Sequence, residues 1–280
     1  MTSSPATPSQ SGVDENLRKA LAAHSRPSQP NPLYASRTFV WRAMIGFKHA
    51  PEQVGEAIVM PFMFVLMFTY LFGGAIAGST GEYLHYFLPG ILVMTVLIMT
   101  VNTGAALNSE IAKGVFDRFR TLPFWQPATI VGALVGDAVR YTFAIVMTIG
   151  LGMVLGFRPD GGVGGALLAL VILLVFAFSV GWIFTTLGMV VRKPESISNT
   201  SMMLLFPLSF ISNIFTKPET MPGWLEAVAR VNPVSHAATA VRGLLHGTAT
   251  ASQIGLVLLV SALLTAIFAP LTMYLYRRKQ

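Results

Sequence analysis

A short charged stretch, residues 110–123, lies between two long apolar runs and carries most of the chemistry that this sequence offers. In a helix, Ile111 and Phe119 share one side, which suits a lipid boundary, while Lys113, Asp117 and Arg120 share the other. The polar side can contact a soluble partner; the alternative is a solvated loop whose basic residues only mark the cytoplasmic side. The predicted contact residues are Glu110, Lys113, Gly114, Phe116, Asp117, Arg118, Phe119 and Arg120.

Other ionisable residues lie within apolar runs, where charges are costly and often functional. Asp137 and Arg140 are three residues apart, so a helix places them on one face as an intramembrane polar pair. We favour an internal ion pair that neutralises itself; the alternative is a gate or a contact with a second subunit. Glu56 begins the first apolar run, where pairing with a nearby basic residue is favoured over proton coupling.

Composition excludes several classes of protein. The chain has no cysteine, which rules out disulfides and thiol chemistry, and its five histidines form no metal-binding spacing, so we predict no metal site. A net charge of +7 would suggest nucleic acid for a soluble chain. However, 53% of the residues are hydrophobic and only 11% are charged, against about 25% charged in soluble proteins. The sequence therefore predicts an integral membrane protein without a nucleic-acid partner.

The apolar runs predict an all-α protein with six spans, since a span needs about 20 apolar residues. The expected spans are residues 54–73, 88–108, 128–156, 164–191, 199–215 and 254–276. The fifth is short, and Pro207 interrupts it. Residues 1–36 are rich in Ser, Pro and Gln and predict a disordered cytoplasmic tail, which leaves 37–280 as the transmembrane domain.

The distribution of Lys and Arg predicts the orientation. Fourteen of the nineteen lie before the first span, in 109–127, in 192–198 or at the C-terminus, so both termini and the charged stretch are expected in the cytoplasm. Segment 37–50 is moderately amphipathic and could lie along the inner surface. Segment 216–253 predicts two short helices broken at Asn232-Pro233, as a re-entrant hairpin or an outer cap. The second helix has apolar residues at helical spacing, namely Val234, Ala237, Ala238, Val241 and Leu245.

Methionine and phenylalanine are abundant, with 14 and 19 copies, and they provide soft, adaptable apolar surfaces. Some of them could line a path for a bulky amphipathic substrate. For any single residue, contact with lipid or a neighbouring helix is the simpler explanation, and Asn102 could instead form an interhelical hydrogen bond. The candidate path residues are Phe64, Met67, Phe68, Asn102, Met203 and Phe206.

Several segments together resemble the membrane subunits of ABC-2 type exporters, in particular their daunorubicin-resistance permease branch. The matching segments are 61–74, 88–94, 113–123, 202–208 and 221–225, followed by Asn232-Pro233 and Arg242. The resemblance covers about residues 39–276. It implies a six-span fold that works as a dimer, a homodimer or a pair with a paralogue, with two copies of a separate ABC ATPase. It also implies that residues 110–122 form the coupling helix, which docks on that ATPase.

The chain has no GxxxxGK[ST] phosphate loop, so ATP and Mg are expected on the partner ATPase and no cofactor on this chain. We predict a permease subunit, not itself an enzyme, that exports a drug, antibiotic or lipid across the bacterial plasma membrane. One alternative is a proton-coupled secondary transporter that uses Glu56 or Asp137. Another is a membrane scaffold that transports nothing.

Overall fold

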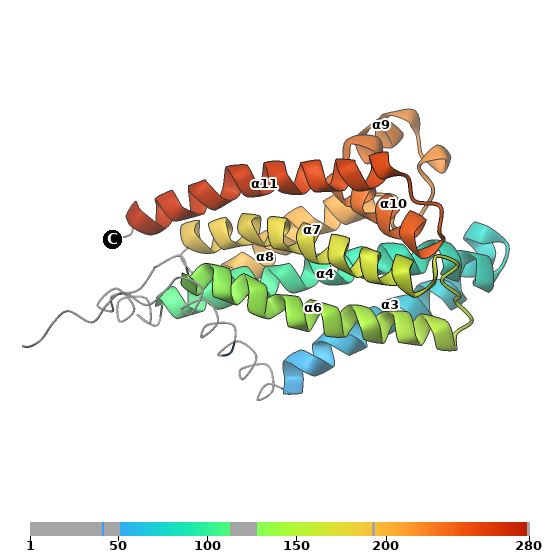
Figure 1. The fold of residues 1–280 in the computed structure, drawn as a ribbon, viewed down its shortest axis with the longest axis horizontal. Helices are drawn as coiled ribbons and strands as arrows, with labels where there is room; N and C mark the ends of the chain where they lie inside the picture. The colour runs from blue at the N-terminus through green and yellow to red at the C-terminus, as the bar shows by residue number, and fades with distance from the viewer. Residues whose placement is uncertain (1–40, 42–50, 113–127, 192–193, 279–280) are drawn as a thin grey trace, which may run out of the picture.

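The structure is a computed structural model that describes residues 41, 51–112, 128–191 and 194–278. Within these ranges the ordered elements are helices, in agreement with the predicted all-α class. In chain order they are α3 (Pro51–Ala77), α4 (Thr80–Ala112), α6 (Ala128–Val154), α7 (Gly162–Val190), α8 (Pro194–Phe210), η1 (Pro218–Thr220), α9 (Gly223–Val231), α10 (Pro233–Leu245) and α11 (Ala251–Arg278). Figure 1 shows the long helices side by side along the long axis, with α9 and α10 at one end and the C-terminus at the other.

Five of the described helices are long and apolar enough to cross a membrane. Their apolar segments are Ile58–Ala77, Thr80–Ala106, Ala133–Val154, Gly162–Val190 and Ala251–Leu275. The remaining expected span, the fifth at 199–215, coincides in part with α8, which begins earlier and ends at Phe210. Its 17 residues reach about 25 Å at 1.5 Å per residue, less than the hydrocarbon thickness of about 30 Å. Five spans are therefore established by length and composition.

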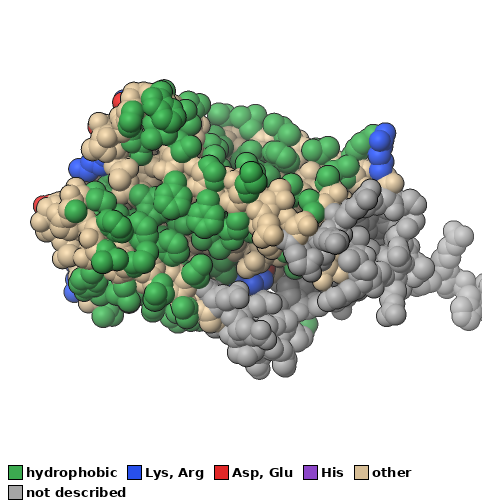
Figure 2. Space-filling model, turned by 180° about the vertical axis from the view of Figure 1, so that it is seen from behind, with side chains coloured by type: hydrophobic (Ala, Val, Ile, Leu, Met, Phe, Trp, Pro, Cys, Tyr) green, Lys and Arg blue, Asp and Glu red, His purple; other side chains and the backbone are tan. Residues whose placement is uncertain are grey.

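Helix α4 lies at the centre of the bundle. Of its most apolar stretch 83% is buried, compared with 22% for α3 and 11% for α11. Helices α3, α6, α7, α8 and α10 all contact it. The peripheral helices turn apolar side chains outward, and Figure 2 shows hydrophobic side chains covering the middle of one face of the molecule. Such a surface suits lipid, which needs no polar partner.

The connection between α3 and α4 differs from the expectation. The first two expected spans, 54–73 and 88–108, leave residues 74–87 as the connection between them, but α3 continues to Ala77 and α4 begins at Thr80, which leaves two connecting residues. Gly78 adopts a positive φ of 78°, which glycine accepts without steric cost. The Ser79 hydroxyl accepts a hydrogen bond from the Glu82 amide at 3.2 Å and so caps the start of α4. The glycine turn and the serine cap thus allow a connection of only two residues between α3 and α4, although the sequence becomes less hydrophobic there.

The two short helices expected in 216–253 are present as α9 and α10, and the break between them is at Asn232 as predicted. The Asn232 side chain accepts from the Val234 amide at 2.9 Å and donates to the Leu208 carbonyl at 2.7 Å. It therefore caps α10 and fastens it to α8. The apolar stripe of α10 is buried, whereas only Ala229 is buried on α9.

Glycines permit two close backbone contacts around α7. A Cβ on Gly104 of α4 would lie 2.5 Å from the Phe184 carbonyl oxygen of α7. A Cβ on Gly161 or Gly165, at the start of α7, would lie 2.1 or 2.3 Å from the Leu244 carbonyl oxygen of α10. Small residues let helix backbones approach closely inside membranes, where van der Waals packing drives association. Helix α7 is thus in close backbone contact with α4 at Phe184 and with α10 at its first turn.

Candidate functional site

The predicted coupling helix lies mostly outside the described residues. Helix α4 continues through Glu110 to Ala112, so the chain is helical where the predicted segment begins. The remaining contact residues, Lys113, Gly114, Phe116, Asp117, Arg118, Phe119 and Arg120, are not among those described. Glu56 lies on α3, and its side chain is not described either. These assignments stay predictions.

The predicted polar pair is an ion pair on α6. An Arg140 guanidinium nitrogen (Nη1) lies 2.9 Å from Asp137 Oδ1, and Asp137 is 6% exposed. The Thr103 hydroxyl of α4 donates to the other carboxylate oxygen, and the Tyr141 hydroxyl lies 3.0 Å from Thr103. Because Thr103 has a single hydroxyl proton, Tyr141 is the donor in that second contact. The carboxylate is therefore held between α4 and α6 by hydrogen bonds on both oxygens.

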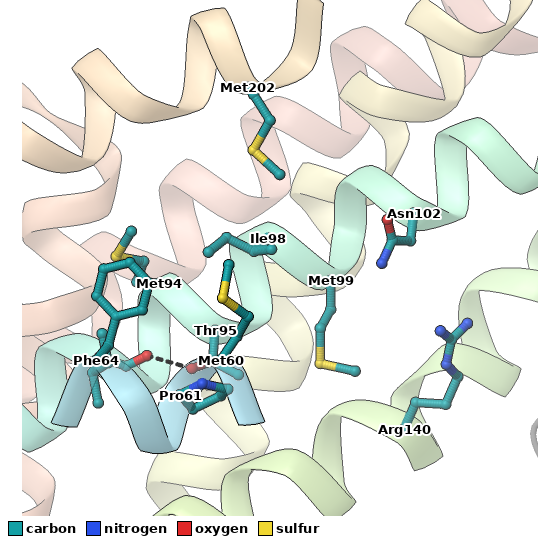
Figure 3. Close-up of a pocket in the computed structure, with 11 residues that line it drawn as sticks. Met60, Pro61, Phe64, Met94, Thr95, Ile98, Met99, Asn102, Arg140 and Met202 are labelled. Atoms are coloured by element: carbon teal, nitrogen blue, oxygen red, sulfur yellow. Dashed lines mark hydrogen bonds between the residues drawn. The ribbon is translucent and has the colours of Figure 1, made fainter. Parts of the chain in front are cut away.

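A cavity of about 320 Å³ adjoins this ion pair. It lies between α3, α4, α6 and α8 (Figure 3). Its lining residues are Met60, Pro61, Phe64, Ile91, Met94, Thr95, Ile98, Met99, Asn102, Arg140 and Met202. Most of them are apolar and flexible, as in pockets that take small organic molecules, while Asn102 and Arg140 form a polar end.

The candidate path residues are divided between three environments. Phe64 and Asn102 line the cavity. Phe68 lies in an aromatic cluster, with its ring centroid 5.4 Å from Phe87 and 5.2 Å from Phe215. The remaining three are exposed on the surface and are absent from the cavity lining that the structure describes: Met67, Met203 and Phe206.

Sequence reasoning missed several residues of this region. Thr103 and Tyr141 are separated by 38 residues, and neither carries a local signal of contact with the other. The residues of α4 that line the cavity did carry a sequence signal, because Ile91, Ile98 and Asn102 follow the spacing of one helix face. Arg140 was predicted as part of a pair, but its place in the wall of a cavity depends on how α3 and α8 pack against α4.

A second contact lies near the end of α4 that leads toward the predicted coupling helix. The Asn108 amide donates to the carbonyl oxygens of Gly188 at 2.6 Å and Val191 at 2.8 Å. Gly188 lies in the last turn of α7 and Val191 caps its C-terminal end, where the final carbonyl groups have no partner within the helix. Asn108 therefore binds the last turn of α7 and joins it to α4, in agreement with the interhelical role considered for such residues.

A third group of polar residues, here called the α4–α10 clamp, lies at the end of the molecule that holds α10. It consists of Arg242, Tyr86 and Asn213. The Arg242 guanidinium donates to the Tyr86 carbonyl at 3.1 Å and the Asn213 carbonyl at 3.0 Å, and it lies 3.9 Å from the centre of the Tyr86 ring. Burial lowers the pKa of Arg242, although neighbouring Tyr86 raises it, and an arginine in proteins stays charged. The clamp fastens α10 to α4 and to the turn after α8.

Comparison with known proteins adds to this geometry. The family model described as ABC-2 type transporter matches residues 34–246. A relative from Streptomyces coeruleorubidus named "Daunorubicin resistance ABC transporter permease protein DrrB1" is 57% identical over 280 residues, which is 100% of this chain and 99% of the relative. A Mycobacterium tuberculosis relative named "Probable doxorubicin resistance ABC transporter permease protein DrrC" is 22% identical over 224 residues, 79% of this chain and 80% of that protein. The chain therefore belongs to the ABC-2 type transporter family, as a membrane permease subunit.

Proposed function

We propose that this permease subunit exports hydrophobic or amphipathic small molecules of the drug class out across the bacterial plasma membrane, driven by ATP. The observation that carries the proposal is 57% identity over the whole chain with a permease named for daunorubicin resistance. The cavity supports the proposal, because a volume of about 320 Å³ with a mostly apolar lining suits a small organic molecule. Lipid remains the second substrate class for the same cavity.

We further propose that two copies of a separate ATPase and a second permease complete the transporter. ATP and Mg would bind the ATPase, since this chain has no phosphate loop. Residues 110–122 would form the coupling helix that docks there. The support is that α4 leads directly into this segment and that Asn108 joins the end of α4 to the last turn of α7. Movement of the coupling helix would therefore act on both helices together.

The proposed topology has six spans, with α8 as the fifth and both termini in the cytoplasm. The described connections from α3 to α4, from α6 to α7 and through α9 and α10 lie at the end of the molecule opposite the C-terminus (Figure 1). That separation supports the proposal, because the loops richer in Lys and Arg are expected on the inner side. A tilted or locally thinned bilayer would accommodate the 17 residues of α8. Helices α9 and α10 would form the re-entrant hairpin.

The test is reconstitution of the full chain with its ATPase in proteoliposomes, with drug-stimulated ATP hydrolysis and drug transport as readouts. Reversal of both charges in Asp117→Lys/Arg120→Glu should weaken assembly and abolish stimulation. The matched control is the reversal Glu226→Arg/Arg230→Glu on α9, where the native pair lies at the surface, at the other end of the molecule from the last turn of α4. Unchanged assembly and stimulation in the first variant would refute the coupling role.

The proton-coupled alternative finds no support in the comparisons. It requires transport without any ATPase and the loss of that transport in Asp137→Asn. The same proteoliposomes without ATPase, given a proton gradient, decide between the two. Uptake under those conditions would refute the ATP-driven proposal.

A further inference from the structure

Aromatic rings continue the wall of the cavity toward the end of the molecule that holds α9 and α10. On α3 the last lining residue in that direction is Phe64, and the ring of Phe68, one turn further, is stacked on it with the centroids 5.7 Å apart. On α4 the corresponding lining residue is Ile91, and Phe87 lies one turn beyond it. The described lining of the cavity includes neither Phe68 nor Phe87. The cavity therefore ends where these rings begin.

Three rings from three segments contact one another at this end of the cavity. They belong to Phe68 of α3, Phe87 of α4 and Phe215 of the turn after α8, and we call them the aromatic seal. The centroid of Phe68 lies 5.4 Å from that of Phe87 and 5.2 Å from that of Phe215, and the last two are 5.8 Å apart. These are the separations of favourable aromatic pairs. Rings that contact one another on all sides leave little room for water, and an apolar constriction resists wetting.

Two of the three rings belong to segments that are fastened together. The turn that carries Phe215 accepts hydrogen bonds at its backbone carbonyl groups from two tyrosine hydroxyls of α4, at distances of 3.3, 2.9 and 2.9 Å. The tyrosines are Tyr83 and Tyr86, and the carbonyl groups are those of Phe215, Asn213 and Thr216. Phe68 comes instead from α3, of whose apolar segment only 22% is buried. Phe87 and Phe215 are therefore fixed relative to each other, and closure depends on the position of Phe68.

We infer that the aromatic seal is the gate that closes the cavity toward the α9–α10 end. A molecule in the cavity leaves in that direction only when Phe68 parts from Phe87 and Phe215. The alternative is an aromatic core that stabilises the fold without controlling access. The inference rests on the proposed export function for its biological meaning, and it adds the element that regulates exit from the same cavity.

Access to the cavity can be measured with one introduced thiol, because the chain has no cysteine. Thr95→Cys places the thiol in the cavity lining with little change in volume. Asp160→Cys marks the α9–α10 side, since the Asp160 side chain is 72% exposed in the connection between α6 and α7. Right-side-out and inside-out vesicles from bacteria that express the full-length permease with its ATPase are treated, without nucleotide, with a membrane-impermeant cationic methanethiosulfonate. The mass of the purified permease reports the rate of modification, and the vesicles in which Asp160→Cys reacts expose the α9–α10 side.

Removal of a ring from the seal should open the cavity from that side. In Phe68→Ala the thiol of Thr95→Cys should react about tenfold or more faster, because the lost ring leaves a gap beside Phe87 and Phe215. Phe215→Leu keeps most of the apolar volume, so it folds even if the first variant does not, and it should raise the rate about threefold. The matched control is Phe178→Ala on α7, whose ring contacts Trp182 at 6.0 Å in a separate apolar cluster and should leave the rate unchanged.

The modification of Asp160→Cys should proceed at one rate in all ring variants, which confirms that the fold is retained. Equal rates for Thr95→Cys with the seal intact and in the folded seal variants would overturn the inference. An equal increase in Phe178→Ala would overturn it as well, because the effect would then not depend on the seal.

The labelling requires neither ATP nor a substrate, so the two proposals can fail separately. A seal that controls access to the cavity in a protein without ATP-driven drug export would sustain the gate and refute the proposed function. Drug export by a protein in which Thr95→Cys reacts from the α9–α10 side as fast with the seal intact as in Phe68→Ala would refute the gate and sustain the proposed function.

Discussion

Gly104→Ala tests the backbone contact between α4 and α7 at the centre of the bundle. The added Cβ would lie 2.5 Å from the Phe184 carbonyl oxygen and 2.8 Å from its carbonyl carbon. Ordinary contact begins at 3.4 Å, so the helices must separate by about 0.9 Å, the difference between 3.4 and 2.5 Å. The obstructing atoms are backbone atoms of a buried helix, which cannot rotate away as the end of a flexible side chain can.

The magnitude follows from two opposed effects. Overpacking of this kind costs about 1–3 kcal/mol, and the rigid obstruction at Phe184 places it toward the upper limit. Alanine in a helix interior regains about 0.8–1 kcal/mol relative to glycine. The net destabilisation expected for Gly104→Ala is therefore about 2 kcal/mol. For a chain of this size each kcal/mol lowers Tm by about 2–4 °C, so the expected decrease is roughly 4–8 °C.

The assay is thermal unfolding of the purified full-length chain in detergent, followed by intrinsic fluorescence. Gly150→Ala is the matched control, because Gly150 lies in the interior of α6 and a Cβ there meets nothing within 4 Å. The control should keep its Tm or raise it slightly. If Gly104→Ala unfolds at the same temperature as Gly150→Ala or higher, the close contact of α4 with α7 is refuted.

Three further predictions concern polar contacts. Asn108→Ala removes the donor to the last turn of α7 and should cost about 1–3 kcal/mol, measured as a lower Tm; no change would mean that water replaces the amide. Arg140→Gln removes the cation beside buried Asp137 and should cost about 3–5 kcal/mol, whereas adding Asp137→Asn should recover part of the folded yield in size-exclusion chromatography. A double variant no more stable than the single one would contradict this. Arg242→Lys loses the planar fork of the α4–α10 clamp and should lower Tm, whereas exposed Arg230→Lys should not; equal Tm values would argue against the clamp.

Hydropathy and local spacing predicted much of the fold. Five of the six expected spans are present. They were predictable because the thickness of the bilayer sets the length of the apolar run that a span needs. The Asp137–Arg140 ion pair and the break at Asn232 were also predictable, since both depend on neighbours in sequence. The two-residue turn at Gly78 was missed because the hydropathy pattern did not indicate that the helices continue beyond the apolar runs.

The candidate site was predicted less completely. An abundance of Met and Phe does not indicate which side of a helix faces a cavity. Both Phe64 and Met203 were candidate path residues, but only Phe64 lines the cavity, whereas Met203 is exposed on the surface. The hydrogen bond from Thr103 to Asp137 joins residues of two helices that are 34 positions apart in the sequence, and a single sequence carries no signal for it. Interhelical contacts of this kind depend on the packing of the whole bundle.

The short connection at Gly78 and Ser79 limits how the wall of the cavity can open. Helix α3 supplies Met60 and Phe64 to that wall, and two residues bind its far end to α4. Because the connection is so short, α3 cannot slide along α4, and any outward movement of α3 is a rotation about the turn at Gly78 and Ser79. The displacement then grows toward Pro51, so a sideways entrance would widen from the first turns of α3 while the opposite end stays sealed.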